Sequence, residues 1–130
     1  IWVVADGFDE EEGADVAARL AVEAAIEYFM LHPGFNTEII NEIMSYANLK
    51  VREKQAETER YSLMHTSFLV VISNYNALLY GNIGNTRFYH LRNGYVISQS
   101  SDDTVAQLLV EVEALNTGDL KYHRQRNDLR

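Results

Sequence analysis

The chain has 130 residues, 47% hydrophobic and 23% charged, a balance that suits one globular domain and argues against intrinsic disorder. Acidic residues (19) outnumber basic residues (11), and the net charge of −8 makes nucleic acid an unfavourable partner. The absence of cysteine excludes disulfides, thiol nucleophiles and cysteine-ligated zinc. No apolar run approaches the ~20 residues that cross a bilayer, so we expect no membrane partner and a cytoplasmic location.

The first half of the chain predicts one strand followed by two helices. The opening run IWVVA is typical of a buried strand, and because it starts with Ile rather than Met we expect the chain to begin within a domain. After an acidic stretch, apolar residues at spacings of three and four predict a helix from Gly13 to Leu31, which His32-Pro33-Gly34 ends. A second apolar stripe predicts a helix from about Thr37 to Arg60.

The second half predicts four strands and a final helix. SFLVVIS, within residues 65–73, is apolar nearly throughout, so we expect both of its faces to be covered. ALLYGNIG, TRFYHLR and YVIS are the other strands, and Asn93-Gly94 between the last two is a strong hairpin signal. From Asp102 the apolar spacing becomes helical again, with Asp102 or Asp103 as the expected N-cap and Thr117-Gly118 as the end.

This order of elements predicts an α+β fold, because strands joined by tight hairpins and segregated from helices favour an antiparallel sheet. The covered strand further suggests that the sheet packs on another sheet, or on helices from both sides. We find no internal repeat and no linker, so residues 1–130 are expected to form part of a single domain. The tail KYHRQRNDLR is a local exception to the acidic composition and holds four of the 11 basic residues.

Several motifs, in order, resemble the metal-dependent protein phosphatase family (PPM, type 2C). They are VADG with RLAVE after it, then MHTS, then LYGNIGNTR, then HLRNGYVISQSSDD, and finally HRQRNDLR. Bacterial members of that family read VADGMGG, GTT, NVGDSR, LRDG and TxDHS at similar spacings. The resemblance spans essentially the whole chain. It implies an α-β-β-α sandwich, in which two packed antiparallel sheets are flanked by helices, and here only part of that domain.

The resemblance also implies a signalling hydrolase that removes phosphate from phosphoserine and phosphothreonine in a protein substrate. The family uses two Mg²⁺ or Mn²⁺ ions and a metal-activated water, and such hard cations bind oxygen ligands. By resemblance, Asp6 would bridge both ions and Gly7 would offer its backbone carbonyl. Asp102 falls at the position of an aspartate that helps to hold a further, weaker ion. No side chain would act as a covalent nucleophile.

The sequence also departs from the family pattern. Asp9-Glu10 replaces two glycines, GNTR replaces GDSR with the loss of one carboxylate, and Asp103 replaces the histidine of TxDH. The family's phosphate-gripping arginine would precede Ile1 and its later aspartates would follow Arg130, so we expect a partial domain without those segments. These departures leave a second interpretation open, namely a non-catalytic phosphatase-like domain that binds or regulates a partner. A third is a regulatory phosphatase of the sporulation or stress-response branch.

Each singled-out residue also has a structural interpretation. Asp9 to Glu12 are expected to form a solvated loop that favours the start of the helix, with metal contact as the minor alternative. Asp102 and Asp103 could be helix caps as readily as ligands. Arg87 is expected to make structural hydrogen bonds, and His65 and His90 are expected to be structural as well. Residue patterns do not indicate an oligomeric state.

Overall fold

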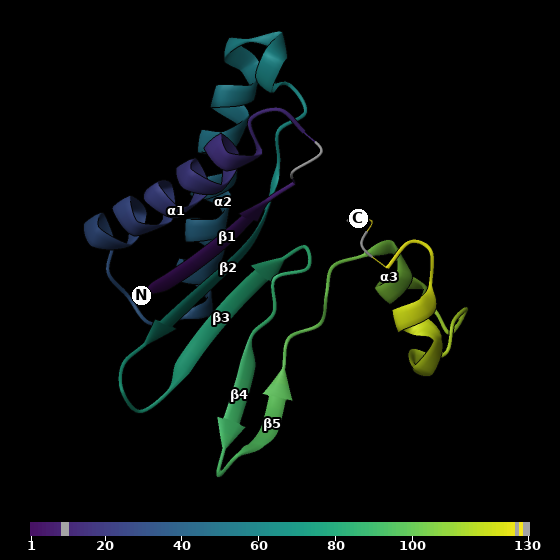
Figure 1. The fold of residues 1–130 in the computed structure, drawn as a ribbon. Coiled ribbons are helices and arrows are strands. Elements are labelled where there is room, and N and C mark those ends of the chain that lie inside the picture. Colours follow the sequence, from purple (N-terminus) through teal and green to yellow (C-terminus); the bar gives the residue numbers. More distant parts are fainter. Residues whose placement is uncertain (9–10, 127, 129–130) are drawn as a thin grey trace. The chain divides into compact units, whose positions relative to one another are not determined.

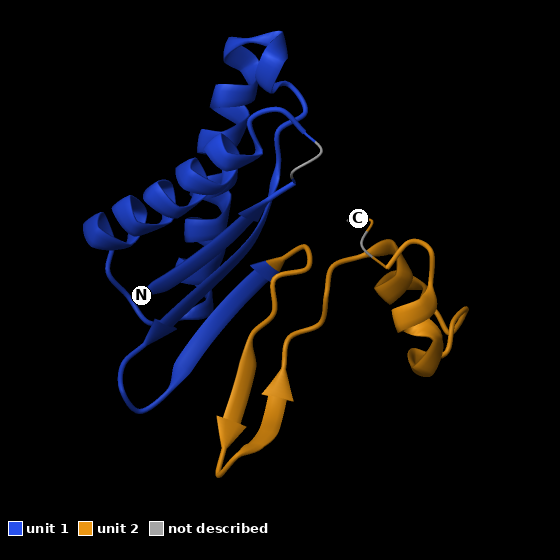
Figure 2. Cartoon of the chain, viewed as in Figure 1, with its two compact units in different colours: residues 1–82 blue, residues 83–130 orange. Residues whose placement is uncertain are grey.

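The computed structural model describes residues 1–8, 11–126 and 128 of the chain. The chain divides into two compact units, residues 1–82 and 83–130, which Figure 2 distinguishes by colour. Among the described residues there are two antiparallel sheets and three α-helices, so the predicted α+β class is confirmed. Within the described ranges no helix is both long and apolar enough to cross a membrane.

The first unit is a sheet with strand order β1-β2-β3 and two helices against one face (Figure 1). Its elements are β1 (Trp2–Gly7), α1 (Ala14–Leu31), α2 (Thr37–Glu57), β2 (Thr66–Ser73) and β3 (Leu78–Ile83), of which only the last residue belongs to the second unit. β1 and β2 pair antiparallel, in a register that places Asp6 opposite Ser67 and Gly7 opposite Thr66. β2 lies between the other two strands, and its residues are buried or half-buried along its whole length, in agreement with the prediction that both of its faces are covered.

The core of this unit lies between the two helices and the sheet. Alanines dominate the buried face of α1, so this helix can approach the sheet closely, while the larger side chains come from α2 and β2. The buried cluster comprises Ala17, Ala21, Ala24, Ala25, Ile40, Ile43, Ala47, Val51, Met64, Phe68, Val70 and Ile72. The predicted apolar stripes of both helices therefore face the core.

Two expectations for this unit were wrong. The strand β1 is not buried on both faces: its side chains alternate, and Trp2 is 62% exposed. The second helix ends at Glu57 rather than near Arg60, because Thr58 adopts an extended backbone with φ −157°. The Thr58 hydroxyl then accepts a hydrogen bond from the Arg60 amide and begins a short 3₁₀ helix, Glu59–Tyr61.

The second unit contains the predicted hairpin, formed by β4 (Tyr89–Arg92) and β5 (Tyr95–Gln99). Asn93 and Gly94 both have positive φ, 52° and 81°, as the two central residues of a type I′ turn require. The Asn-Gly signal thus identified the turn correctly.

The last helix, α3 (Val105–Glu111), is shorter than the apolar spacing predicted, and a 3₁₀ helix, Thr117–Tyr122, follows it. Glu113 has a φ of 60°, which turns the backbone out of the helix, and the Leu115 amide bonds back to the Leu109 carbonyl. Periodicity alone did not reveal this stop, because a non-glycine residue makes the left-handed turn.

Candidate functional site

The carboxylate of Asp6 lies at the end of β1, on the exposed face of the strand. Neighbouring groups hold its backbone: the Ser67 hydroxyl donates to the Asp6 carbonyl at 3.2 Å, across the β1–β2 pairing. No hydrogen bond or ion pair joins the Asp6 side chain to any other residue that the structure describes. A carboxylate that is fixed by its strand and free at its oxygens is available to a cation.

Gly7 stands where the chain leaves β1 and the first turn of α1 comes back against the strand. A Cβ built on Gly7 would lie 2.2 Å from the carbonyl oxygen of Ala14 and 2.5 Å from its carbonyl carbon. Both atoms belong to the backbone, so no rotamer change can relieve the contact. Only glycine allows this approach, which keeps the turn beside Asp6 tight.

The loop that follows is tied to neighbouring segments at several points. The Phe8 amide donates to the His65 carbonyl at 3.2 Å, and the two rings stack with their centroids 4.6 Å apart. Nδ1 of His65 lies 2.8 Å from the carbonyl oxygen of Leu63. These contacts agree with a structural role for His65.

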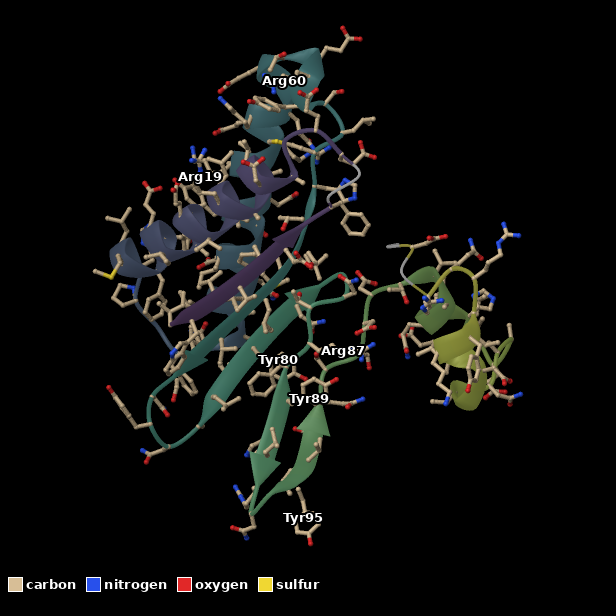
Figure 3. All side chains as sticks on the ribbon, viewed as in Figure 1. Arg19, Arg60, Tyr80, Arg87, Tyr89 and Tyr95 are labelled. Atoms are coloured by element: carbon tan, nitrogen blue, oxygen red, sulfur yellow. The ribbon has the colours of Figure 1, made fainter. Side chains whose placement is uncertain are left out.

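The acidic stretch is only partly within the described residues, since Asp9 and Glu10 lie outside them. Glu12 is exposed, and its Oε1 accepts a hydrogen bond from Nε of Arg60 at 2.6 Å (Arg60 is labelled in Figure 3). This ion pair joins the loop to the 3₁₀ helix that follows α2. Glu12 therefore has a cationic partner of its own, which the sequence pattern did not reveal because the two residues are 48 positions apart.

Asp102 belongs to the second unit and is held by Arg87. Nε and Nη2 of Arg87 each donate to one carboxylate oxygen at 2.6 Å, a bidentate pair in which the Asp102 side chain is only 9% exposed. Nη1 of Arg87 also donates to the Tyr89 hydroxyl at 3.4 Å, and Figure 3 labels both residues. The hydrogen bond to Asp102, followed by the one to Tyr89, raises the pKa of the Arg87 guanidinium. The expected structural role of Arg87 is confirmed.

The interpretation of Asp102 or Asp103 as the helix cap was wrong. Thr104 is the N-cap of α3, and its hydroxyl accepts a hydrogen bond from the Gln107 amide at 3.2 Å. Thr104 is 1% exposed, so a buried hydroxyl caps the helix rather than either of the two preceding aspartates. A cation at Asp102 would have to compete with Arg87 for both carboxylate oxygens.

The oxygen donors at the end of β1 fit a hard divalent cation in kind but not in number. The Asp6 carboxylate and the Gly7 carbonyl are the ligand types that Mg²⁺ and Mn²⁺ prefer. Within the described residues, however, no group of three or more acidic, histidine or cysteine side chains could surround an ion. Asp6 and Gly7 lie in the first unit and Asp102 in the second. The residues that the structure describes therefore do not make up a complete set of metal ligands.

Comparison with known structures defines the class of fold first. PstP, a serine/threonine phosphatase of Mycobacterium tuberculosis, matches with a TM-score of 0.84 and 24% identity, over 98% of this chain and 55% of that one. MsPP, a PPM Ser-Thr phosphatase of Mycobacterium smegmatis, gives 0.81 and 26%, over 98% and 53%. The fold is therefore that of bacterial PPM phosphatases, and this chain spans about half the length of these structures.

The family itself is shown by sequence. The family model described as protein phosphatase 2C matches residues 1–124, so the chain belongs to the protein phosphatase 2C family. A structure of the PstP catalytic domain in complex with two manganese ions also matches, with a TM-score of 0.76 and 24% identity over 90% of this chain and 51% of that one. A search of curated proteins gave no match. The resemblance seen in the motifs is confirmed.

Proposed function

We propose that this chain is part of a metal-dependent protein phosphatase that hydrolyses phosphoserine or phosphothreonine. The observation that carries the proposal is the Asp6 carboxylate, which ends β1 without a partner among the described residues, beside a glycine that admits no side chain. Family membership and the manganese bound in the PstP catalytic domain support it.

In this proposal Asp6 and Gly7 hold Mg²⁺ or Mn²⁺ through the carboxylate and the backbone carbonyl. When bound, such ions supply Lewis-acid activation of water and offset charge on the phosphoryl group. The protein's own contribution is to hold these ligand atoms in place. The pairing of β1 with β2 fixes the backbone of Asp6, and the close contact between Gly7 and Ala14 fixes the turn. The role that the resemblance implies for Asp102, at a further and weaker ion, stays a prediction.

The test is Mn²⁺-dependent hydrolysis of a phosphothreonine peptide by the full-length protein and its Asp6→Asn variant. Asparagine keeps the shape but loses the charge, and we expect kcat/KM to fall by at least about 100-fold. Mn²⁺ binding measured by calorimetry should weaken in parallel. Asp15→Asn is the matched control, because Asp15 is an exposed aspartate in the first turn of α1 and its loss removes the same charge.

Asp15→Asn should retain activity within about twofold of the wild type, because an exposed charge that contacts no reacting group contributes little. Equal activity of the Asp6→Asn variant and the wild type would refute the assignment of Asp6. A folded wild-type protein that binds Mn²⁺ but shows no hydrolysis of any phosphopeptide would favour the other interpretation, a non-catalytic binding domain.

A further inference from the structure

The second unit contains a pocket of about 520 Å³ whose lining includes neither Asp6 nor Gly7. Three parts of the chain line it: the turn before β4, the segment before α3, and the 3₁₀ helix with the tail that follows. The lining residues are Asn85, Arg87, Asp102, Thr117, Gly118, Leu120, Lys121 and Arg126. Basic side chains from sequence positions far apart therefore converge on one hollow.

The charge of this pocket is opposite to that of the chain. Three cations and one carboxylate give the lining a net charge of +2, in a chain whose net charge is −8. Asp102 is neutralised by its bidentate pair with Arg87, which leaves the charges of Lys121 and Arg126 uncompensated within the pocket. Neither of these two side chains forms a salt bridge with another residue in the described part of the chain.

The two cations differ in what holds them. The ammonium group of Lys121 lies over the ring of Tyr122, 4.7 Å from its centroid, a contact that leaves its hydrogen-bond donors free. Arg126 is exposed and presents a planar guanidinium, a geometry that matches the paired oxygens of a phosphate. Thr117 and Asn85 add uncharged polar groups to the same lining.

We propose that this pocket binds a phosphate-class dianion, with Lys121 and Arg126 as its charged contacts. Arg87 acts as a positioning residue, because it cancels the Asp102 carboxylate that would otherwise repel the anion. The dianion has two sources, either free inorganic phosphate or the phosphoryl group of a phosphorylated protein. The second source rests on the proposed phosphatase function, whereas the binding of phosphate itself does not.

The experiment is a phosphate titration of the ¹⁵N-labelled full-length protein, followed by amide chemical shifts. EDTA keeps the protein free of divalent cations, so the result does not depend on the proposed metal site. Chloride holds the ionic strength constant, because exposed charges are screened by salt. We expect saturable shifts in the millimolar range at the amides of Thr117, Gly118 and Asn85.

Two pairs of variants test the contacts. Arg126→Ala should weaken phosphate binding by about tenfold, whereas Arg124→Ala, which removes the same charge from an exposed tail residue that does not line the pocket, should change it by less than about twofold. A Cβ on Gly118 would meet no atom within 4 Å, so Gly118→Asp can place a carboxylate in the pocket without a clash. Gly118→Asn is its uncharged control, and only the aspartate should abolish binding.

A phosphothreonine peptide as a second titrant distinguishes the sources. Tighter binding of the peptide than of inorganic phosphate, lost in Gly118→Asp, would identify a phosphorylated protein as the ligand, and equal binding would identify phosphate. The absence of a saturable shift in the wild type would overturn the proposal. So would an affinity that is unchanged in both Arg126→Ala and Gly118→Asp. This titration contains no metal, so it tests the phosphate pocket alone. A failure to detect Mn²⁺-dependent hydrolysis would count against the proposed phosphatase function but not against the pocket.

Discussion

The contact between Gly7 and the first turn of α1 makes a sharp prediction for Gly7→Ala. Two carbon atoms in favourable contact lie about 3.5–4.0 Å apart, whereas the new methyl group would lie 2.5 Å from the carbonyl carbon of Ala14. The strand end and the helix must therefore separate by about 1 Å. Overpacking of this kind costs about 1–3 kcal/mol, and we expect the upper end, because backbone rather than a flexible side chain must move.

The measurement is urea unfolding of the purified protein, followed by circular dichroism. A loss of about 3 kcal/mol in the free energy of unfolding would lower the midpoint by roughly 1.5 M for a slope of about 2 kcal/mol per M. Gly34→Ala is the control in the same unit, since its Cβ would meet Cγ1 of Ile39 at 2.8 Å, an atom of a side chain that can rotate away. Its cost should stay below about 1 kcal/mol, partly offset by the stiffer unfolded chain.

Equal midpoints for Gly7→Ala and Gly34→Ala would refute the argument that backbone proximity requires glycine at Gly7. The same variant also tests the link from fold to site. Because Gly7 adjoins Asp6, a displaced turn should weaken Mn²⁺ binding of the folded Gly7→Ala protein, measured by calorimetry, more than Gly34→Ala does. An unchanged Mn²⁺ affinity of Gly7→Ala would show that the tight turn at Gly7 does not affect the proposed metal site.

Three further predictions concern the ion pairs and the cap. Arg87→Ala should lower the free energy of unfolding of the second unit by about 2 kcal/mol, which is less than the loss expected for a fully buried pair because Arg87 is 47% exposed. A double-mutant cycle with Asp102→Asn should show that the two effects are coupled, and additive effects would contradict the pair. Thr104→Val keeps the shape but removes the hydroxyl that caps α3, so it should cost about 1 kcal/mol in thermal unfolding. Thr104→Ser keeps the hydroxyl that caps the helix but lacks the methyl group. If Thr104→Ser lost as much stability as Thr104→Val or more, the methyl group rather than the cap would be the main source of stability at this position. Arg60→Ala breaks an exposed ion pair with Glu12 and should lower the free energy of unfolding by less than about 1 kcal/mol. This loss should be smaller still in 1 M NaCl, because salt screens exposed charges. A loss that does not depend on salt would indicate that the Arg60 side chain stabilises the protein by packing on Tyr61 instead.

The sequence predicted most elements because their signals are local. Apolar spacing located both helices of the first unit, and Asn93-Gly94 predicted a turn whose two positive φ angles the structure contains. The errors arose where a backbone stop had no sequence signature. Glu113 adopts a left-handed conformation without being glycine, and Thr58 ends α2 by turning extended. Backbone conformations of this kind set helix boundaries that apolar periodicity does not reveal.

The site was less predictable because its electrostatics depend on residues that are distant in sequence. Asp102 and Arg87 were each singled out, yet they are 15 positions apart, and nothing in the sequence indicated that they form a bidentate pair. A carboxylate can serve as a cation ligand, a helix cap or a salt-bridge partner, and the group opposite it determines which. For Asp102 that group is a guanidinium, and for Asp6 the described chain provides none. Asp6 is therefore the better candidate for a metal ligand. Asp102 is neutralised by Arg87, so the pocket that both residues line keeps a net positive charge.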